Sequence, residues 1–203
     1  MIINEMNLGN YIVPDDARNG VCLEIGSNVG NFFTKYKNFF KLIHYYEPVS
    51  DTFEISKSKS CLSNNIVGFN EAAFSSTGES IEMVTHFNNE SGSCSIRDGK
   101  QDWTSNVISV VNSVSIETCI DRMSQQSHTP TIDYLKMDCE CCEYYFLMNK
   151  DLSNIKYIGM EIHGQLGEKN WYDLLNHISK THSISGNTQY RSDNNSEIFC
   201  QLN

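Results

Sequence analysis

Short apolar runs along the chain alternate with longer segments in which apolar residues recur at helical spacing. The runs predict strands over about 21–25, 42–46, 66–69, 131–137 and 155–162. The segments between them predict helices over about 29–40, 50–57, 115–123, 142–149 and 168–179. Strands that alternate with helices are typical of a parallel sheet with helices on both faces, so the sequence predicts an α/β fold.

The two ends of the chain depart from this alternation. Residues 1–19 form a mixed lead-in segment with a short strand expected at 11–13, and we expect the segment to cover the sheet or a cofactor. Near the other end, 182–185 and 196–202 are extended in pattern and flank a Gly-Asn turn region. They predict a terminal antiparallel pair of strands.

The middle of the chain is less regular. Residues 72–74 and 81–84 predict short extended pieces, the second an edge strand or hairpin arm, and the β-branched run 107–114 predicts another extended segment. Between them, 86–106 is polar and rich in Gly and Ser. A long loop of this kind is often functional, so we expect a substrate or lid loop there.

Length and composition limit the classes of protein. The 203 residues fit a single domain, and 39% hydrophobic with 20% charged residues is typical of a globular protein. The net charge of −10 argues against nucleic acid as a partner, because phosphate binding needs a basic surface. Neither a secretion signal nor an apolar stretch of about 20 residues is present, so we expect a cytoplasmic protein without a membrane partner. The oligomeric state stays open.

The eight cysteines do not suggest a disulfide framework. Cys139, Cys141 and Cys142 are crowded together, and adjacent cysteines pair poorly with each other. We therefore expect free thiols in a reducing compartment. Zinc binding by these three residues is an alternative, but the sequence lacks the second half of such a site.

The most informative stretch follows the first predicted strand, where Glu24, Gly26 and Gly30 have the spacing E-x-G-x-x-x-G. Two glycines allow a sharp turn and a close approach of a ligand to the backbone, and the helix that follows directs N–H groups at the same place. The dinucleotide fingerprint G-x-G-x-x-G and the P-loop are both absent. The turn suits a smaller ligand such as S-adenosylmethionine, although glycines that serve packing alone would look the same.

Polar residues recur where the predicted strands end. In a parallel sheet these ends share one edge and converge on one cleft. Glu47 closes the second strand, where a carboxylate can accept both hydroxyls of a ribose, and Pro48 fixes the turn after it. Polar residues at the ends of the five strands are Glu24, Glu47, Asn70 with Glu71, Asp138 with Glu140, and Glu161 with His163.

Together these residues resemble the FkbM family of S-adenosylmethionine-dependent methyltransferases. The resemblance runs from about residue 21 to residue 163 in the family's order, and the ordered set is more specific than any one motif. Its motifs here are LEIGSNVG (23–30), YEP (46–48), NEAAF (70–74), SVSIE (113–117), IDYLKMDCE (132–140) and MEIH (160–163).

The resemblance implies a Rossmann-like class I methyltransferase fold, with a seven-stranded, mostly parallel sheet whose last strand is antiparallel. It implies methyl transfer, typically to a hydroxyl of a sugar, glycan or other small molecule, with S-adenosylmethionine as cofactor. Asp138 then faces the methyl group, Glu47 the ribose, and Asn70, Glu71 and Ala72 the adenine. The residues implied around the methionine part are Glu24, Gly26, Ser27, Asn28 and Gly30.

One departure from the family pattern K-x-D-x-E-G-x-E is informative, because Cys141 replaces its glycine. If that position needs a positive φ, a cysteine is strained there. The turn would then be reshaped or the site weakened. Glu24 in place of the more usual Asp is a mild change.

A hydroxyl acceptor must lose its proton, and the candidate groups are Asp138, Glu140, Glu161 and His163. His163 is the natural general base, because an ordinary histidine titrates near neutrality, but a structural histidine is equally open. Alternatively, Asp138, Glu161 and His163 hold a divalent metal, Mg²⁺ for example, that acidifies the hydroxyl.

Other functions stay open at this point. A catalytically weakened binding module is consistent with Cys141, and an N-methyltransferase would share the same cofactor turn. A nucleoside-binding dehydrogenase is disfavoured by the missing G-x-G-x-x-G.

Overall fold

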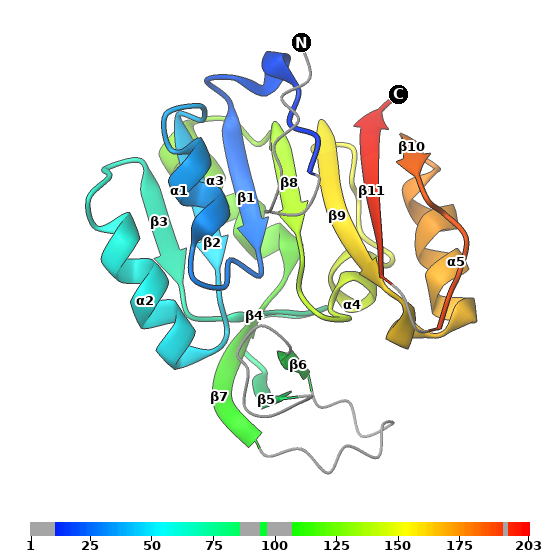
Figure 1. The fold of residues 1–203 in the computed structure, drawn as a ribbon. Coiled ribbons are helices and arrows are strands. Elements are labelled where there is room, and N and C mark those ends of the chain that lie inside the picture. Colours follow the sequence, from blue (N-terminus) through cyan, green and yellow to red (C-terminus); the bar gives the residue numbers. More distant parts are fainter. Residues whose placement is uncertain (1–10, 86–93, 97–106, 193–194) are drawn as a thin grey trace.

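A seven-stranded sheet runs through the middle of the molecule (Figure 1). The computed structural model describes residues 11–85, 94–96, 107–192 and 195–203. The strand order is β10-β11-β9-β8-β1-β2-β3, and β11 alone runs antiparallel to its two neighbours. The predicted sheet with an antiparallel last strand is therefore confirmed. Its strands are β1 (Val21–Ile25), β2 (Leu42–Tyr46), β3 (Ile66–Phe69), β8 (Tyr134–Met137), β9 (Tyr157–His163), β10 (His182–Gly186) and β11 (Asn195–Leu202).

Helices cover both faces of this sheet (Figure 1). One face packs against the N-terminal segment, α1 and α2 through an aromatic cluster that includes Tyr11, Phe33 and Tyr45. The other face packs against α3, α4 and α5 in a larger aliphatic cluster around Trp171. The helices are α1 (Asn31–Tyr36), α2 (Ser50–Ser60), α3 (Ile116–Ser127), α4 (Glu143–Leu147) and α5 (Glu168–Ile178), with short 3-10 turns η1 (Asp15–Ala17) and η3 (Gly164–Leu166).

The register of the central strands brings their carboxyl ends to one level. Ile25 at the end of β1 lies opposite Tyr46 on β2 and Met137 on β8. The residues that follow these three strands therefore begin side by side at the same sheet edge, as expected for a parallel sheet.

A second, four-stranded sheet lies next to this edge (Figure 1). Its order is β4-β7-β5-β6, and β5 pairs antiparallel with both β7 and β6. Of the two predicted alternatives for 81–84, this excludes the edge strand and is consistent with the hairpin arm. Its apolar side chains form a small core around Ala72, Ile81 and Met83. The strands are β4 (Ala72–Ala73), β5 (Ser80–Thr85), β6 (Cys94–Ile96) and β7 (Val107–Val114).

Several predicted boundaries change. The first helix is shorter than 29–40, because Gly30 is left-handed and the chain leaves the helix after Tyr36. Residues 11–13 form no strand, but the buried Tyr11 and Val13 cover the sheet as expected of the lead-in segment. Within 86–106, Cys94–Ile96 forms a strand, and the rest of the predicted lid loop lies outside the described residues. The other predicted strands and helices are present with ends shifted by a few residues.

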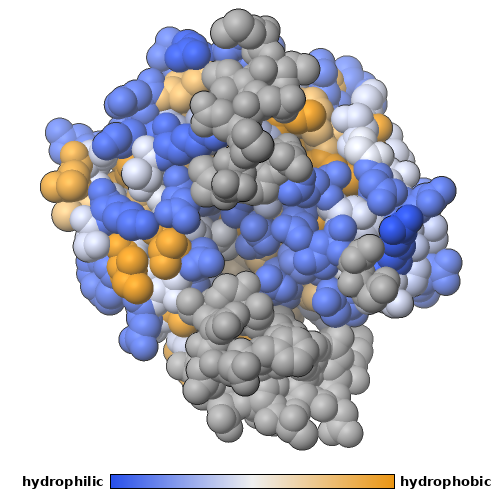
Figure 2. Space-filling model, in the orientation of Figure 1, coloured by the Kyte–Doolittle hydropathy of each residue, from blue (hydrophilic) through white to orange (hydrophobic). Residues whose placement is uncertain are grey.

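The described surface is mostly hydrophilic on the face shown in Figure 2. Among the described residues, the large exposed apolar side chains are Ile55 in α2, Leu62 in the turn after it, Val110 in β7 and Tyr172 in α5. No helix in the described ranges is long and apolar enough to cross a bilayer.

Candidate functional site

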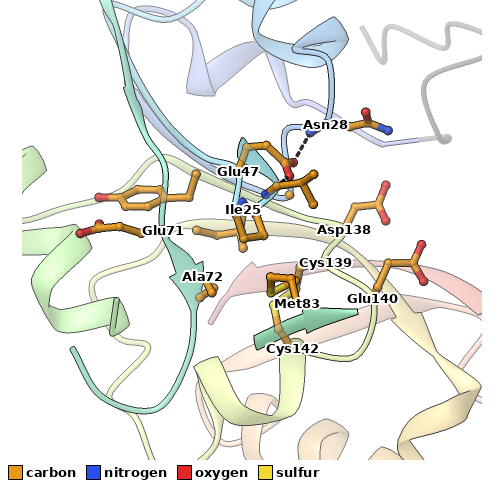
Figure 3. Close-up of a pocket in the computed structure, with 15 residues that line it drawn as sticks. Ile25, Asn28, Glu47, Glu71, Ala72, Met83, Asp138, Cys139, Glu140 and Cys142 are labelled. Carbon is orange, nitrogen blue, oxygen red and sulfur yellow. Dashed lines mark hydrogen bonds between the residues drawn. A yellow bond between two sulfur atoms is a disulfide. The ribbon is translucent and has the colours of Figure 1, made fainter. Parts of the chain in front are cut away.

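A cleft opens at the carboxyl edge of the main sheet, between the ends of β1, β2 and β8 and the small sheet (Figure 3). It encloses about 610 Å³ including its solvent-facing side. Figure 3 shows Glu71 and Ala72 at one end and Asp138 and Glu140 at the other. The cleft is therefore elongated, with carboxylates at both ends.

The turn after β1 forms as its glycines predict. Gly26 has a φ of 73°, and a Cβ there would stand 1.8 Å from the carbonyl oxygen of Asp138, so no other residue fits. Gly30, with a φ of 77°, caps α1 from the left-handed region, and Asn28 also has a positive φ of 49°. The turn brings the β1 and β8 ends into contact and leaves its backbone facing the cleft.

Glu47 is a cleft carboxylate that two backbone hydrogen bonds hold in place. Its Oε2 accepts the N–H of Asn28 at 2.8 Å, and its Oε1 accepts the N–H of Val49 at 2.8 Å (Figure 3). The side chain is 5% exposed, and burial raises its pKa to about 7 against the opposing effect of these hydrogen bonds. Each oxygen retains a second lone pair, so the group can still accept hydroxyls from a ligand.

The three residues expected near an adenine behave differently from one another. Asn70 donates to the carbonyls of Glu47 at 2.8 Å and Pro48 at 3.1 Å, so it joins the ends of β2 and β3 and does not line the cleft. Glu71 lines the cleft but is paired with both Nη atoms of Arg122 from α3. Ala72 lines the cleft through β4.

Glu24 points away from the cleft into the protein. It is fully buried, and neither oxygen has a hydrogen-bond partner of normal geometry among the described residues, although the N–H of Phe33 is near enough to lower its pKa slightly. Burial raises its pKa to about 8, and the charge of Lys136 opposes the rise. Glu24 therefore contributes indirectly, beneath the glycine turn.

Lys136 was missed by the sequence interpretation. It lies in β8, is 5% exposed, and donates from Nζ to the carbonyl of Gly26 at 2.9 Å. The same Nζ is 3.7 Å from Oδ2 of Asp138. A lysine inside a buried apolar strand was the signal, because a buried charge needs a partner.

The loop between β8 and α4 carries the strongest backbone irregularity of the site. Glu140 has a φ of 51° and Cys141 a φ of 78°, so the turn keeps the left-handed backbone that the family glycine would favour. Cys139 and Cys142 form a disulfide across it, with Cα atoms 5.5 Å apart. The expectation of eight free thiols is therefore wrong for these two residues, because the turn brings together cysteines three positions apart.

The end of β9 lies beside this loop, and neither Glu161 nor His163 lines the cleft. His163 is fully buried, with Nδ1 2.7 Å from Oε1 of the buried Glu143 and Nε2 3.4 Å from Oε2 of Glu140. Burial disfavours its charged form, but the charges of Glu143, Glu140 and Glu161 and the hydrogen bond to Glu143 raise its pKa to about 9. The raised pKa favours the charged imidazole more than the ordinary titration that was expected.

The pKa values of the neighbouring carboxylates Glu140 and Glu161 are raised above that of an ordinary glutamate. Burial, together with the charges of Asp138, Glu143 and Glu161, raises the pKa of Glu140 to about 7, and His163 opposes this. Burial and the charge of Asp138 also raise the pKa of Glu161. A carboxylate with such a pKa is a better proton acceptor than a surface acid.

The structure thus brings together part of the predicted set. Eight of its members line the cleft: Gly26, Asn28, Glu47, Pro48, Glu71, Ala72, Asp138 and Glu140. Six lie beside or beneath it: Glu24, Ser27, Gly30, Asn70, Glu161 and His163. Seven lining residues were not predicted: Ile25, Tyr46, Val49, Ala73, Met83, Cys139 and Cys142. Most of these are apolar, so nothing in the sequence distinguishes them from core residues.

Solved structures with a similar fold include methyltransferases. The Methyltransferase FkbM from Methylobacillus flagellatus KT superposes with a TM-score of 0.54 and 12% identity, over 89% of this chain and 43% of that chain. The present chain thus spans less than half the length of that protein. A putative methyltransferase from Streptococcus mutans in complex with SAH gives a TM-score of 0.50 and 8% identity, over 91% of this chain and 89% of that chain. At these identities the likeness shows a shared class I methyltransferase-type fold.

Comparison of the sequence itself is more specific. None of the curated proteins matches the chain. The model of the Methyltransferase FkbM domain, however, matches residues 24–183, which span the glycine turn, the cleft and β9. The chain therefore belongs to the FkbM methyltransferase domain family.

Proposed function

We propose that this protein binds S-adenosylmethionine in the cleft and transfers its methyl group to a hydroxyl of a sugar, glycan or related small molecule. The observation that carries the proposal is the convergence of the Gly26 turn, Glu47 and the Asp138–Glu140 loop on one elongated cleft. The Streptococcus mutans protein of the same fold was solved with SAH, which supports the choice of cofactor.

The middle of the cleft suits an adenosyl ligand. Glu47 is oriented by two backbone N–H groups and keeps lone pairs for ribose hydroxyls. The apolar Ile25, Val49 and Met83 line the same cavity and can enclose a base. Gly26, which has no side chain, also lines this cavity, so its backbone can face the amino-acid part.

The far end of the cleft suits an acceptor that must lose a proton. Methyl transfer from a sulfonium is an in-line displacement, for which alignment contributes roughly 7–11 kcal/mol. Asp138 and Glu140 line the cleft, whereas Glu161 and His163 do not. We therefore assign proton acceptance to Glu140, next to the methyl position at Asp138, and not to His163.

Calorimetry tests the cofactor assignment. SAH should bind with micromolar affinity, and NAD should not bind. Glu47→Gln keeps the size of the side chain but loses a charged acceptor, so we expect SAH affinity to fall at least about tenfold. Glu54→Gln, an exposed acid of α2, is the matched control and should bind normally. Unchanged affinity in Glu47→Gln would remove Glu47 from the site.

Radiolabelled methyl transfer to a panel of sugars and glycans tests the reaction. Glu140→Gln should lower kcat by about 10²-fold or more with little change in SAH affinity, as expected of a proton acceptor. If the label appears on nitrogen, the acceptor assignment is wrong while the cofactor assignment stands. If SAH binds but no hydroxyl is methylated across the panel, the binding-module alternative, which Cys141 already suggested, is supported instead.

A further inference from the structure

Three side chains from two neighbouring strand ends meet at one end of the cleft, where Asp138 lines it and Glu161 and His163 do not. Asp138 follows β8, and Glu161 and His163 end β9. One potential ligand atom of each lies within 4.8 Å of the others. Adjacent ligands of an ion with bonds of about 2.1 Å lie about 3.0–3.4 Å apart, so shifts of about 1–2 Å would close the group around it.

His163 has the surroundings typical of a metal ligand. Its Nδ1 is held by Oε1 of Glu143 at 2.7 Å, and both side chains are buried. Its Nε2 is also buried and has no hydrogen-bond partner among the described residues, although Oε2 of Glu140 is 3.4 Å away. A histidine that binds a metal usually has its other ring nitrogen fixed by a carboxylate in this way.

The local charge also favours a cation. Among the described residues at this edge, five carboxylates gather around two positive side chains, and Glu161 and Glu197 face each other across β9 and β11. Lys136 donates to the carbonyl of Gly26 at 2.9 Å, and its Nζ lies 3.7 Å from Oδ2 of Asp138. The carboxylates concerned are Asp138, Glu140, Glu143, Glu161 and Glu197, and the positive side chains are Lys136 and His163.

We propose that Asp138, Glu161 and Nε2 of His163 bind one divalent transition-metal ion, with Glu143 as the positioning residue for the imidazole. A mixed nitrogen and carboxylate set favours Mn²⁺ or Zn²⁺ over Ca²⁺ and Mg²⁺. The role of the ion rests on the function proposed above: at the Asp138 end of the cleft it would bind the acceptor oxygen and lower the pKa of its hydroxyl. The binding itself requires neither cofactor nor acceptor.

Titration with Mn²⁺ tests the site without any turnover. The whole chain is treated with a chelator, desalted and titrated, while electron paramagnetic resonance measures the free Mn²⁺. We expect one ion per chain with a Kd below about 100 µM, displaced by Zn²⁺ at lower concentration than by Mg²⁺. Wild-type protein that binds no ion more tightly than about 100 µM would overturn the proposal and leave an ion-pair cluster of His163 with its carboxylates.

Matched variants locate the ion. Asp138→Asn, Glu161→Gln and His163→Asn each remove one ligand, and we expect Mn²⁺ affinity to fall at least about tenfold in each. Glu143→Gln touches no ion, yet its effect on the imidazole should lower Mn²⁺ affinity by about 10- to 100-fold. Glu54→Gln, with the same loss of charge on the surface, should bind normally.

Folding is checked separately in each variant by its melting temperature and by SAH binding. A folded set of variants that all retain the wild-type Mn²⁺ affinity places the ion elsewhere and overturns the site. Loss of Mn²⁺ binding with normal SAH binding in Glu161→Gln and Glu143→Gln, whose side chains do not line the cleft, supports it. Failure of SAH binding in wild-type protein counts against the proposed function and not against the metal site, so the two can fail independently.

Discussion

Glu24 and Glu47 are both acidic residues near strand ends, but only one faces the cleft. Glu47 lines the cavity and is oriented by the backbone N–H groups of Asn28 and Val49. Glu24 is fully buried beneath the turn, with burial as the main cause of its raised pKa. At the scale of single residues, the fold thus separates a carboxylate that can bind a ligand from one that affects stability.

The raised pKa of Glu24 predicts a pH dependence of stability. Its pKa is about 8 in the folded protein against 4.5 for an ordinary glutamate, so folding favours the protonated form. The corresponding stabilisation is complete below the unfolded pKa and is lost as the pH rises through the folded one, by an amount on the order of a few kcal/mol. Glu24→Gln cannot ionise, so its melting temperature should exceed that of wild-type protein at about pH 9 and approach it at about pH 5.

Calorimetric melting of both proteins across this range measures the difference. Glu54→Gln is the control for removal of a surface charge and should follow wild-type protein at every pH. A constant offset between Glu24→Gln and wild-type protein would show that Glu24 does not titrate between these values.

At the scale of elements, the β8–α4 loop is the least regular part of the site. Two successive non-glycine residues, Glu140 and Cys141, have positive φ values, and the Cys139–Cys142 disulfide closes the loop around them. The disulfide links the two ends of the loop, and Glu143 at the start of α4 reaches His163 on β9. The loop therefore holds Glu140 at the cleft at the expense of backbone strain.

This strain predicts that Cys141→Gly stabilises the protein. Glycine adopts a φ of 78° without penalty, so the free energy of unfolding should rise by about 1 kcal/mol. Cys61→Gly makes the same chemical change at a φ of −60°, where the backbone is not strained. This variant should therefore lower the free energy of unfolding by about 0.5–1 kcal/mol. Urea denaturation of both variants measures the two changes. Destabilisation of Cys141→Gly similar to that of Cys61→Gly would show that the left-handed turn carries no strain.

At the scale of the whole molecule, charge decides which partners can approach. The chain carries a net charge of −10, and the carboxylates at the ends of β8 and β9 add a local excess of negative charge beside the cleft. A polyanion would be repelled over distances of about 10 Å at 0.1 M salt. The described part of the face shown in Figure 2 is mostly hydrophilic.

We therefore predict that the protein does not bind RNA. Fluorescence anisotropy of a labelled single-stranded RNA of about 20 nucleotides should stay unchanged up to about 50 µM protein even at low salt, where electrostatic binding is strongest. A basic RNA-binding protein serves as the positive control. Saturable binding that weakens as salt is added would reveal a basic surface that the net charge conceals and would reopen nucleic acid as an acceptor.

The order of the elements and the glycine turn could be predicted from the sequence, because both depend on local patterns. Apolar runs and helical spacing predict the strands and helices of the main sheet. The turn after β1 needs a glycine at position 26, because a Cβ there would clash with the backbone of Asp138. The polar residues at the strand ends also predicted which edge of the sheet carries the cleft, because the carboxyl ends of parallel strands lie at the same edge. For the same reason Glu47, Asp138 and Glu140 were predicted in the cleft where they are found.

Tertiary structure alone decided which of these side chains face the cleft and what each one contacts. Asn70 is diverted to the carbonyls of Glu47 and Pro48, and His163 is enclosed by Glu143 from another element. Cys139 and Cys142 meet only because the loop between them turns left-handed. Such contacts depend on the register between strands and on the path of loops. Register and loop path bring together residues that are far apart in the sequence, or the two ends of one loop. A local pattern of residue types determines the backbone of an element but not the partner of a buried polar side chain, because that partner comes from whatever packs against it.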